Sequence, residues 1–218
     1  MKELEKAQNF LRENVIRSFW KKLTTQHPST CVHEGISIHF DQPLTKEALF
    51  EMVDKMTQCS HKKLAVAAPL YQYNFEPDNS TPHHISALTL NRHGDNYILT
   101  LFNPKGKGSL RKKQEKIFLD LLKKLLQIKL QSKVIVRQYS GPNLQINDNV
   151  GLCQLYSLLY LYEYVNHPQD ITPDKFIKHI RKKHGHYNQK TLLNFWCTVL
   201  KKDVDQVKLH HTSFTRNL

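Results

Sequence analysis

Residues 84–103, HISALTLNRHGDNYILTLFN, decide the fold, because they contain two apolar segments joined by a cluster of turn-forming residues. His84 to Leu90 and Tyr97 to Phe102 are rich in β-branched and large apolar side chains, as buried strands are. The connection between them, residues 91–96, contains Asn, Gly and Asp, which tight hairpins favour. The stretch therefore predicts an antiparallel hairpin, with His84 opening one strand and Asn103 following the other.

Upstream of the hairpin, residues 64–70 form a short apolar run, which we expect to be a strand ended by Pro69 and followed by a loop over 75–82. Alternation from Val32 to Phe40 predicts a further short strand. Apolar residues at helical spacing predict an amphipathic helix within residues 1–24. They also predict a helix after Pro43, with Leu49, Phe50, Val53 and Met56 on its apolar stripe.

Downstream of the hairpin, the pattern alternates between helix and strand. Ser109 can cap a long helix, and residues 133–137 return as a strand. Residues 155–164 are so uniformly apolar and aromatic that we expect a helix buried on most sides, and two more helices near 173–184 and 188–201. The core face of the helix after Ser109 is expected to consist of Ile117, Phe118, Leu121, Leu122, Leu125 and Leu126. The fold class is α+β, with a central mixed sheet flanked by helices.

The amino-acid composition indicates which partners the chain could bind, but not which reaction it catalyses. The chain of 218 residues carries 32 Lys plus Arg against 19 Asp plus Glu, a formal charge of +13, so acidic proteins and nucleic acids are plausible partners. The basic residues lie mostly in amphipathic helical runs, which favours solvated helix faces about two to one over a dedicated nucleic-acid groove.

Four widely spaced cysteines do not suggest a disulfide framework, and we expect a reducing, intracellular compartment. No apolar run is long enough to span a bilayer, and the first residues do not resemble a secretory signal. We therefore expect a soluble chain that lacks both a membrane span and a cleaved targeting segment.

Cys153 is the cysteine best placed for chemistry, because it lies at the N-terminal edge of the predicted buried helix. A helix N-terminus or a neighbouring histidine lowers the pKa of a thiol, and the thiolate is the reactive form. Taken alone, a cysteine beside an apolar helix is more often a packing residue, by about three to one. Its base would be His84, oriented by Asn103 across the hairpin, with His83 as the alternative if the strand register differs by one residue.

The order of these residues resembles the clan CE cysteine proteases, which include adenovirus-type proteases, ubiquitin-like-protein proteases and YopJ-like acetyltransferases. The resemblance covers roughly residues 64–165: a strand ending near Pro69, the strand opened by His84, Asn103 after the next strand, then Gln145 and Cys153. It implies a papain-like clan CE fold, with the nucleophile at the N-terminus of a buried helix.

The resemblance also implies site roles: Cys153 as nucleophile, His84 as base and Asn103 as the residue that orients the base. Gln145 would supply the oxyanion donor, with Asn147 and Gln138 as competing candidates. From the length of the chain we expect a helical N-terminal extension over residues 1–60, contributing to substrate recognition, and one catalytic domain over 61–218.

On this resemblance we expect a thiol protease or isopeptidase, acting as a deubiquitinase on ubiquitin or ubiquitin-like conjugates, as a bacterial effector inside a host cell does. The alternatives are a viral maturation protease, a YopJ-like acetyltransferase, and a non-catalytic basic scaffold. We expect no cofactor. The histidine clusters, such as His210-His211, lack the repeated spacing of a zinc site, so we expect no metal.

Overall fold

The computed structural model describes residues 31–32, 36–39, 46–58, 65–73, 84–108, 112–144, 152–166 and 171–184. Four predicted features lie outside these ranges: the helix within residues 1–24, the loop 75–82, the cap at Ser109 and the helix 188–201. The elements in chain order are β1 (Cys31–Val32), β2 (Ile36–His39), α2 (Lys46–Thr57), β3 (Ala65–Tyr73), β4 (His84–His93), β5 (Asn96–Phe102), η1 (Gly106–Gly108), α3 (Lys112–Leu130), β6 (Val134–Gln138), α4 (Leu152–Asn166) and α5 (Pro173–His184).

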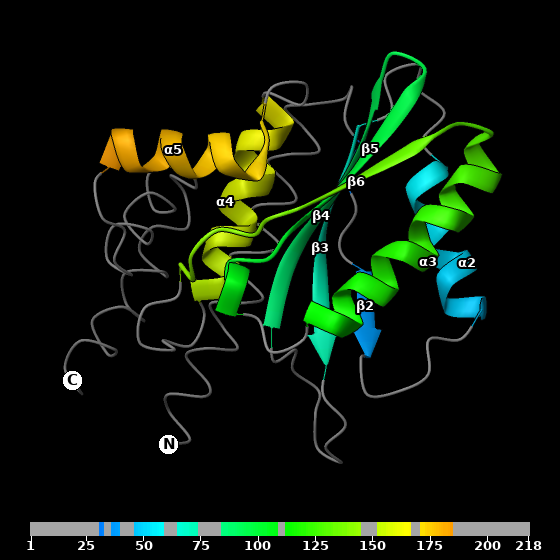
Figure 1. Cartoon of the computed structure of the whole chain (residues 1–218), viewed down its shortest axis with the longest axis horizontal. Helices are drawn as coiled ribbons and strands as arrows, with labels where there is room; N and C mark the ends of the chain where they lie inside the picture. The colour runs from blue at the N-terminus through cyan, green and yellow to red at the C-terminus, as the bar shows by residue number, and fades with distance from the viewer. Residues whose placement is uncertain are drawn as a thin grey trace, which may run out of the picture.

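These elements form a mixed sheet with helices on both faces (Figure 1), so the predicted α+β class is confirmed. The strand order is β1-β3-β4-β5-β6, and β2 also pairs with β3. The central pairs β3–β4 and β4–β5 are antiparallel, while β1, β2 and β6 each run parallel to their neighbour.

The predicted hairpin is present, and its strands are longer than expected. His93 pairs with Asn96, so only Gly94 and Asp95 remain in the turn. Gly94 has φ +61°, which is the left-handed conformation that a two-residue hairpin turn requires and that glycine adopts without strain.

The expectation that Pro69 ends its strand is wrong, because β3 continues to Tyr73. On one edge of β3, β1 pairs with Val66 and Ala67, and β2 pairs only from Leu70 onward. The proline, which has no backbone N–H to donate, thus falls in the gap between two short partner strands.

One face of the sheet is covered by α2 and α3. The apolar core between them comprises Leu49, Met52, Val53 and Met56 from α2, Leu88, Leu90, Leu99 and Leu101 from the hairpin, Phe118, Leu119, Leu122 and Leu126 from α3, and Val134 from β6. An ion pair between Lys129 Nζ and Asp54 Oδ1, 3.0 Å apart, joins the two helices at their surface.

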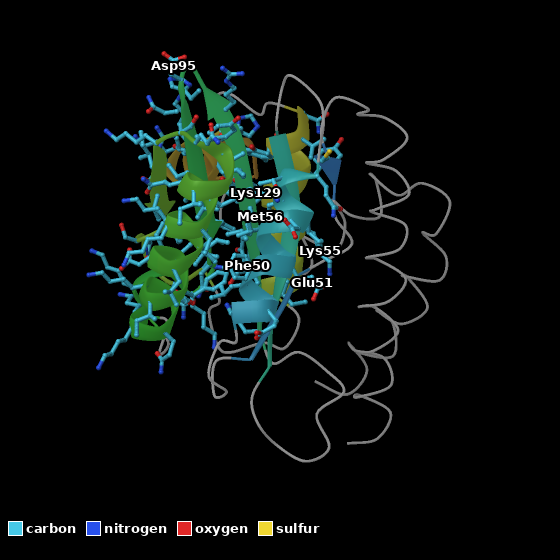
Figure 2. The ribbon with its side chains drawn as sticks, turned by 90° about the vertical axis from the view of Figure 1, so that its right-hand side faces the viewer. Phe50, Glu51, Lys55, Met56, Asp95 and Lys129 are labelled. Atoms are coloured by element: carbon cyan, nitrogen blue, oxygen red, sulfur yellow. The ribbon has the colours of Figure 1, made fainter. Side chains whose placement is uncertain are left out.

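Three residues predicted to be in the core are solvent-exposed. Phe50 is 52% exposed and lies on the edge of α2 toward α3, away from Glu51 and Lys55 on the same helix (Figure 2). On α3, Ile117 and Leu121 are exposed, while Glu115 and Leu119 are buried in their place. The buried face of α3 is therefore rotated from the predicted one, because it must also accommodate Glu115.

The other face of the sheet is covered by α4, against which α5 packs (Figure 1). Phe102 of β5 stacks on Tyr160 of α4 with ring centroids 4.6 Å apart, and Phe176 of α5 meets both rings edge-on at 5.2 Å. Most residues of α4 are buried, as its uniformly apolar sequence predicts.

Residues 31–57, which we assigned to an N-terminal extension, contribute two strands and a core helix to this sheet and its core. The division of the chain at residue 60 itself remains a prediction. Cys31 is disulfide-bonded, which differs from the expectation of reduced cysteines, whereas Cys153 is a free, buried thiol. None of the helices in the described ranges is both long and apolar enough to cross a membrane.

Candidate active site

His84 and Asn103 meet at the end of the hairpin where β4 begins and β5 ends. The register sets Ala87 opposite Phe102, so that one step further along the ladder Asn103 lies diagonally across from His84 on the same face. His84 Nε2 lies 2.8 Å from Asn103 Oδ1, and both side chains are buried, with 8% and 1% of their surface exposed. The two residues that the sequence predicted to be neighbours are thus in direct contact.

The orientation of the Asn103 amide follows from its other contacts. The backbone N–H of Lys105 donates to Oδ1 at 2.9 Å, which identifies that atom as the oxygen. On the other side, Nδ2 donates to Glu115 Oε1 at 2.5 Å. An oxygen that faces the ring requires His84 Nε2 to carry a proton, which leaves Nδ1 as the nitrogen that can accept one.

The carboxylate behind Asn103 comes from the first turn of α3. Glu115 is fully buried, and its second oxygen, Oε2, accepts a hydrogen bond from Gln138 Nε2 at 3.0 Å. Gln138 was a remote candidate for the oxyanion donor, and its amide is instead directed at this carboxylate. The sequence pattern did not single out Glu115, although this residue lies three positions before Phe118 and therefore at helical spacing with the apolar stripe of α3.

The backbone around Asn103 is held by a short network of main-chain hydrogen bonds. Gly106 N donates to the carbonyl of Asn103 at 2.9 Å, and Lys107 N donates to the carbonyl of Gly141 at 2.9 Å. Leu144 N donates to the carbonyl of Pro104, also at 2.9 Å. Leu144 immediately precedes Gln145, so the chain leading to the predicted oxyanion donor starts next to the turn that carries Asn103.

Gly106 is a glycine for steric reasons as well as for its φ of +49°. A Cβ atom placed there would overlap the carbonyl oxygen of Gly141 and lie 2.9 Å from the ring of Tyr139. The segment 139–141 can therefore approach the Asn103 turn only because residue 106 has no side chain.

Cys153 is the second residue of α4, and its side chain is 7% exposed. Ser157, one turn later, donates its hydroxyl to the carbonyl of Ile85 at 3.0 Å, and Ile85 follows His84 directly. Residues four apart lie on the same helix face about 6 Å from each other along the axis, so this bond brings the first turn of α4 close to the start of β4. Figure 1 shows that the first turn of α4 and η1 lie at the same end of the sheet.

The remaining candidates lie outside the described residues. These are Gln145, Asn147 and His83, so the oxyanion donor and the alternative base remain predictions.

Ser157 was not predicted from the sequence, because it lies within a strongly apolar run in which only its hydroxyl group distinguishes it. Among the described residues no group of His, Cys, Asp and Glu side chains is arranged to hold a metal ion.

A comparison with solved structures supports the fold. The Rickettsia bellii effector protein RickCE aligns over 89% of this chain and 96% of its own, with a TM-score of 0.52 and 12% sequence identity. The chain has the fold of the clan CE cysteine proteases. No protein-family model and no curated protein matches its sequence.

Two further solved structures align with this chain at lower TM-scores. The pS273R protease of ASFV matches with a TM-score of 0.48 and 13% identity over 76% of this chain. The Legionella pneumophila effector protein RavZ matches with a TM-score of 0.43 and 11% identity over 81% of this chain. The chain spans only 42% and 58% of the two pS273R structures and 47% of RavZ.

Proposed function

We propose that this chain is a cysteine-dependent hydrolase of peptide or isopeptide bonds, with Cys153 as nucleophile, His84 as general base and Asn103 as the residue that orients the base. The observation that carries the proposal is the buried hydrogen bond between His84 Nε2 and Asn103 Oδ1. It commits one ring nitrogen to the amide and leaves Nδ1 for proton exchange with a thiol.

The location of Cys153 supports its role as nucleophile. The N-terminal end of a helix favours negative charge by about 0.3–1 kcal/mol, so the first turn of α4 favours the anionic intermediate that forms when Cys153 attacks a carbonyl. Backbone N–H groups in the first turn of a helix have no partner within the helix, and we propose that those of α4 donate to the oxyanion. A buried thiol on another part of α4 would have neither advantage.

The reaction proceeds in two steps with balanced proton transfers. Nδ1 of His84 takes the thiol proton as Sγ of Cys153 attacks the substrate carbonyl, and the imidazolium then protonates the leaving amine. Water attacks the resulting thioester, its proton passes to His84, and release of the carboxylic acid regenerates the free thiol. Gln145 donates to the oxyanion in both steps, and loss of one such donor typically costs about 100- to 1000-fold in rate.

We extend the proposal to ubiquitin or ubiquitin-like conjugates as the substrate and to an effector acting inside a host cell. The support for this extension is the chain order His84, Asn103, Gln145, Cys153, which resembles that of the clan's modifier-specific proteases. The fold shared with RickCE, a bacterial effector, agrees with it. The formal charge of +13 favours encounter with acidic surfaces.

A panel of suicide probes, each a ubiquitin-like protein with an electrophile at its C-terminus, tests the proposal. Intact mass and peptide mapping should show one adduct, on Cys153, with at least one probe. The adduct should be absent in Cys153→Ala and in His84→Ala. A protein that forms no adduct with any probe, yet incorporates radiolabelled acetyl groups from acetyl-coenzyme A, would instead be a transferase.

A further inference from the structure

Glu115 is a buried carboxylate in contact with the proposed triad. It is 0% exposed, and its two oxygens accept hydrogen bonds from two side-chain amides, Asn103 Nδ2 and Gln138 Nε2. Acidic side chains are almost never fully buried unless they are paired, because removing the charge from water costs several kcal/mol. The carboxylate of Glu115 is therefore buried beside Asn103 at a cost in free energy, which indicates a specific role for its charge.

We infer that Glu115 is a positioning residue, which orients the Asn103 amide and supplies the negative charge that Asn103 itself lacks. The inference rests on the proposed function, because it assigns Glu115 a role in activating the Cys153 and His84 pair. It concerns a residue that does not touch the substrate and acts only through Asn103.

Orientation is the first part of this role. An asparagine amide can present either its oxygen or its nitrogen to a neighbour. A nitrogen facing His84 Nε2 would select the tautomer with its proton on Nδ1, which cannot accept the proton of a thiol. Because Glu115 accepts from Nδ2, the oxygen is directed to the ring. The carboxylate in turn is held by Gln138, so that a chain of three side chains runs from β6 to His84.

Charge is the second part. When His84 takes the thiol proton it becomes an imidazolium, which a neutral amide stabilises less than a carboxylate would. Hydrogen bonds in a chain polarise one another inside a protein. The negative charge of Glu115 therefore makes the Asn103 oxygen a stronger hydrogen-bond acceptor. Glu115 stabilises the His84 imidazolium through Asn103 and not by direct contact.

A charge swap distinguishes this role from simple packing. Glu115→Gln keeps an amide oxygen able to accept from Asn103 and removes the charge. In the double variant Asn103→Asp/Glu115→Gln, the new amide nitrogen at position 115 can donate to the new carboxylate at position 103, while the new amide oxygen accepts from Gln138. Every hydrogen bond of the network is then retained, and the negative charge moves one residue closer to His84.

The readout is the second-order rate of Cys153 alkylation by iodoacetamide at pH 7, which needs no knowledge of the substrate. Glu115→Gln should react at least about tenfold more slowly than wild type, and the double variant should return to within about threefold of wild type. Asp120→Asn, the same change at an exposed position of α3, serves as the matched control and should leave the rate unchanged. Circular dichroism melts check that each variant is folded.

Two results would overturn the inference. One is a Glu115→Gln rate equal to that of wild type, and the other is a double variant no faster than Glu115→Gln. If Glu115→Gln does not fold, the double variant alone tests the inference. An alkylation rate within about threefold of wild type supports it, and a slower rate overturns it. A wild-type rate no higher than that of His84→Ala would overturn the proposed function as well, so the two failures are distinguishable.

Discussion

A histidine can accept the proton of a thiol only when its ring is held in one orientation. In this chain the orientation of the His84 ring depends on a few atoms around Asn103. Oδ1 accepts from His84 and from the backbone of Lys105 at once, while the carbonyl of the same residue closes a turn with Gly106. The position of the imidazole therefore depends on the backbone after β5 as much as on the strand that carries His84.

Gly106→Ala should disturb this turn. The added Cβ would meet the carbonyl of Gly141 and force a side chain into a positive φ, so we expect a loss of stability larger than the roughly 1–2 kcal/mol of the φ term alone. Alkylation of Cys153 should slow as well. Urea unfolding and the iodoacetamide rate measure the two effects.

Gly94→Ala is the matched control for that change. Gly94 has a similar φ of +61°, but a Cβ there meets no atom within 4 Å. It lies in the hairpin turn that follows His93, at the opposite end of β4 from His84. It should lose about 1–2 kcal/mol and keep the wild-type alkylation rate. Equal effects of the two alanines on alkylation would contradict the role given to the Asn103 turn.

The sequence singled out His84, Asn103 and Cys153 as candidates because each lies at the end of a strongly patterned segment. It missed Glu115 and Ser157, since both are polar residues within apolar stripes, and their partners lie 12 and 72 residues away in the chain. Such contacts depend on how elements pack, which periodicity does not encode. The same limit explains why Gln138 was considered as an oxyanion donor and not as a support for Glu115.

At the scale of elements, α4 depends on a side-chain bond to hold its first turns against β4. Ser157→Ala removes the donor to the carbonyl of Ile85 and should cost about 1 kcal/mol of stability. Because Cys153 lies on the same face one turn earlier, its alkylation should also slow. Chemical denaturation and alkylation rates measure both.

Tyr160→Phe is the control on the same helix. The Tyr160 hydroxyl is buried and has no hydrogen-bond partner among the described residues, so its removal should leave stability within about 0.5 kcal/mol of wild type. A Ser157→Ala variant that resembles Tyr160→Phe in both measurements would show that the bond to Ile85 does not position α4.

The register of α3 gives a second prediction at this scale. Leu122 is fully buried in the core between α3 and the sheet, and Leu122→Ala should cost about 2–5 kcal/mol. Ile117, which the sequence pattern assigned to the same face, is 50% exposed, and Ile117→Ala should change stability by less than about 1 kcal/mol. Comparable losses in urea unfolding would mean that the predicted core face was right after all.

The order and type of the described elements were predictable, since strands and helices differ in apolar period and turn residues separate them. The errors concern where a strand ends and which face of a helix is buried. β3 passes through Pro69 because two short strands share its edge, and α3 rotates to bury Glu115. In each case the deciding contact comes from a distant part of the chain.

At the scale of the whole molecule, two buried tyrosines link stability to alkaline pH. Burial is the main cause that raises the pKa of Tyr160 well above its usual value near 10. Burial likewise raises the pKa of Tyr164, with a smaller contribution from Tyr160. Both rings therefore stay neutral in the folded protein at pH values where they ionise in the unfolded chain.

The sign of the effect follows from proton binding. Above about pH 10 the unfolded state releases the tyrosine protons and the folded state keeps them, so stability is fully present below that pH and falls above it. The slope should approach about 1.4 kcal/mol per pH unit for each tyrosine. Urea unfolding between about pH 9 and 11 measures it, and Tyr160→Phe should reduce the slope; an unchanged slope would show that Tyr160 ionises as readily when folded.

The central claim is that His84 activates Cys153, and the alkylation of one thiol tests it most directly. Iodoacetamide is added to the folded wild type and to His84→Ala at pH 7, and the rate at Cys153 is followed by peptide mass spectrometry. An unassisted thiol of pKa about 8.5 is only a few per cent thiolate at this pH, so wild type should react at least about tenfold faster than His84→Ala. Equal rates in two folded proteins would contradict the claim and leave Cys153 as a packing residue of α4.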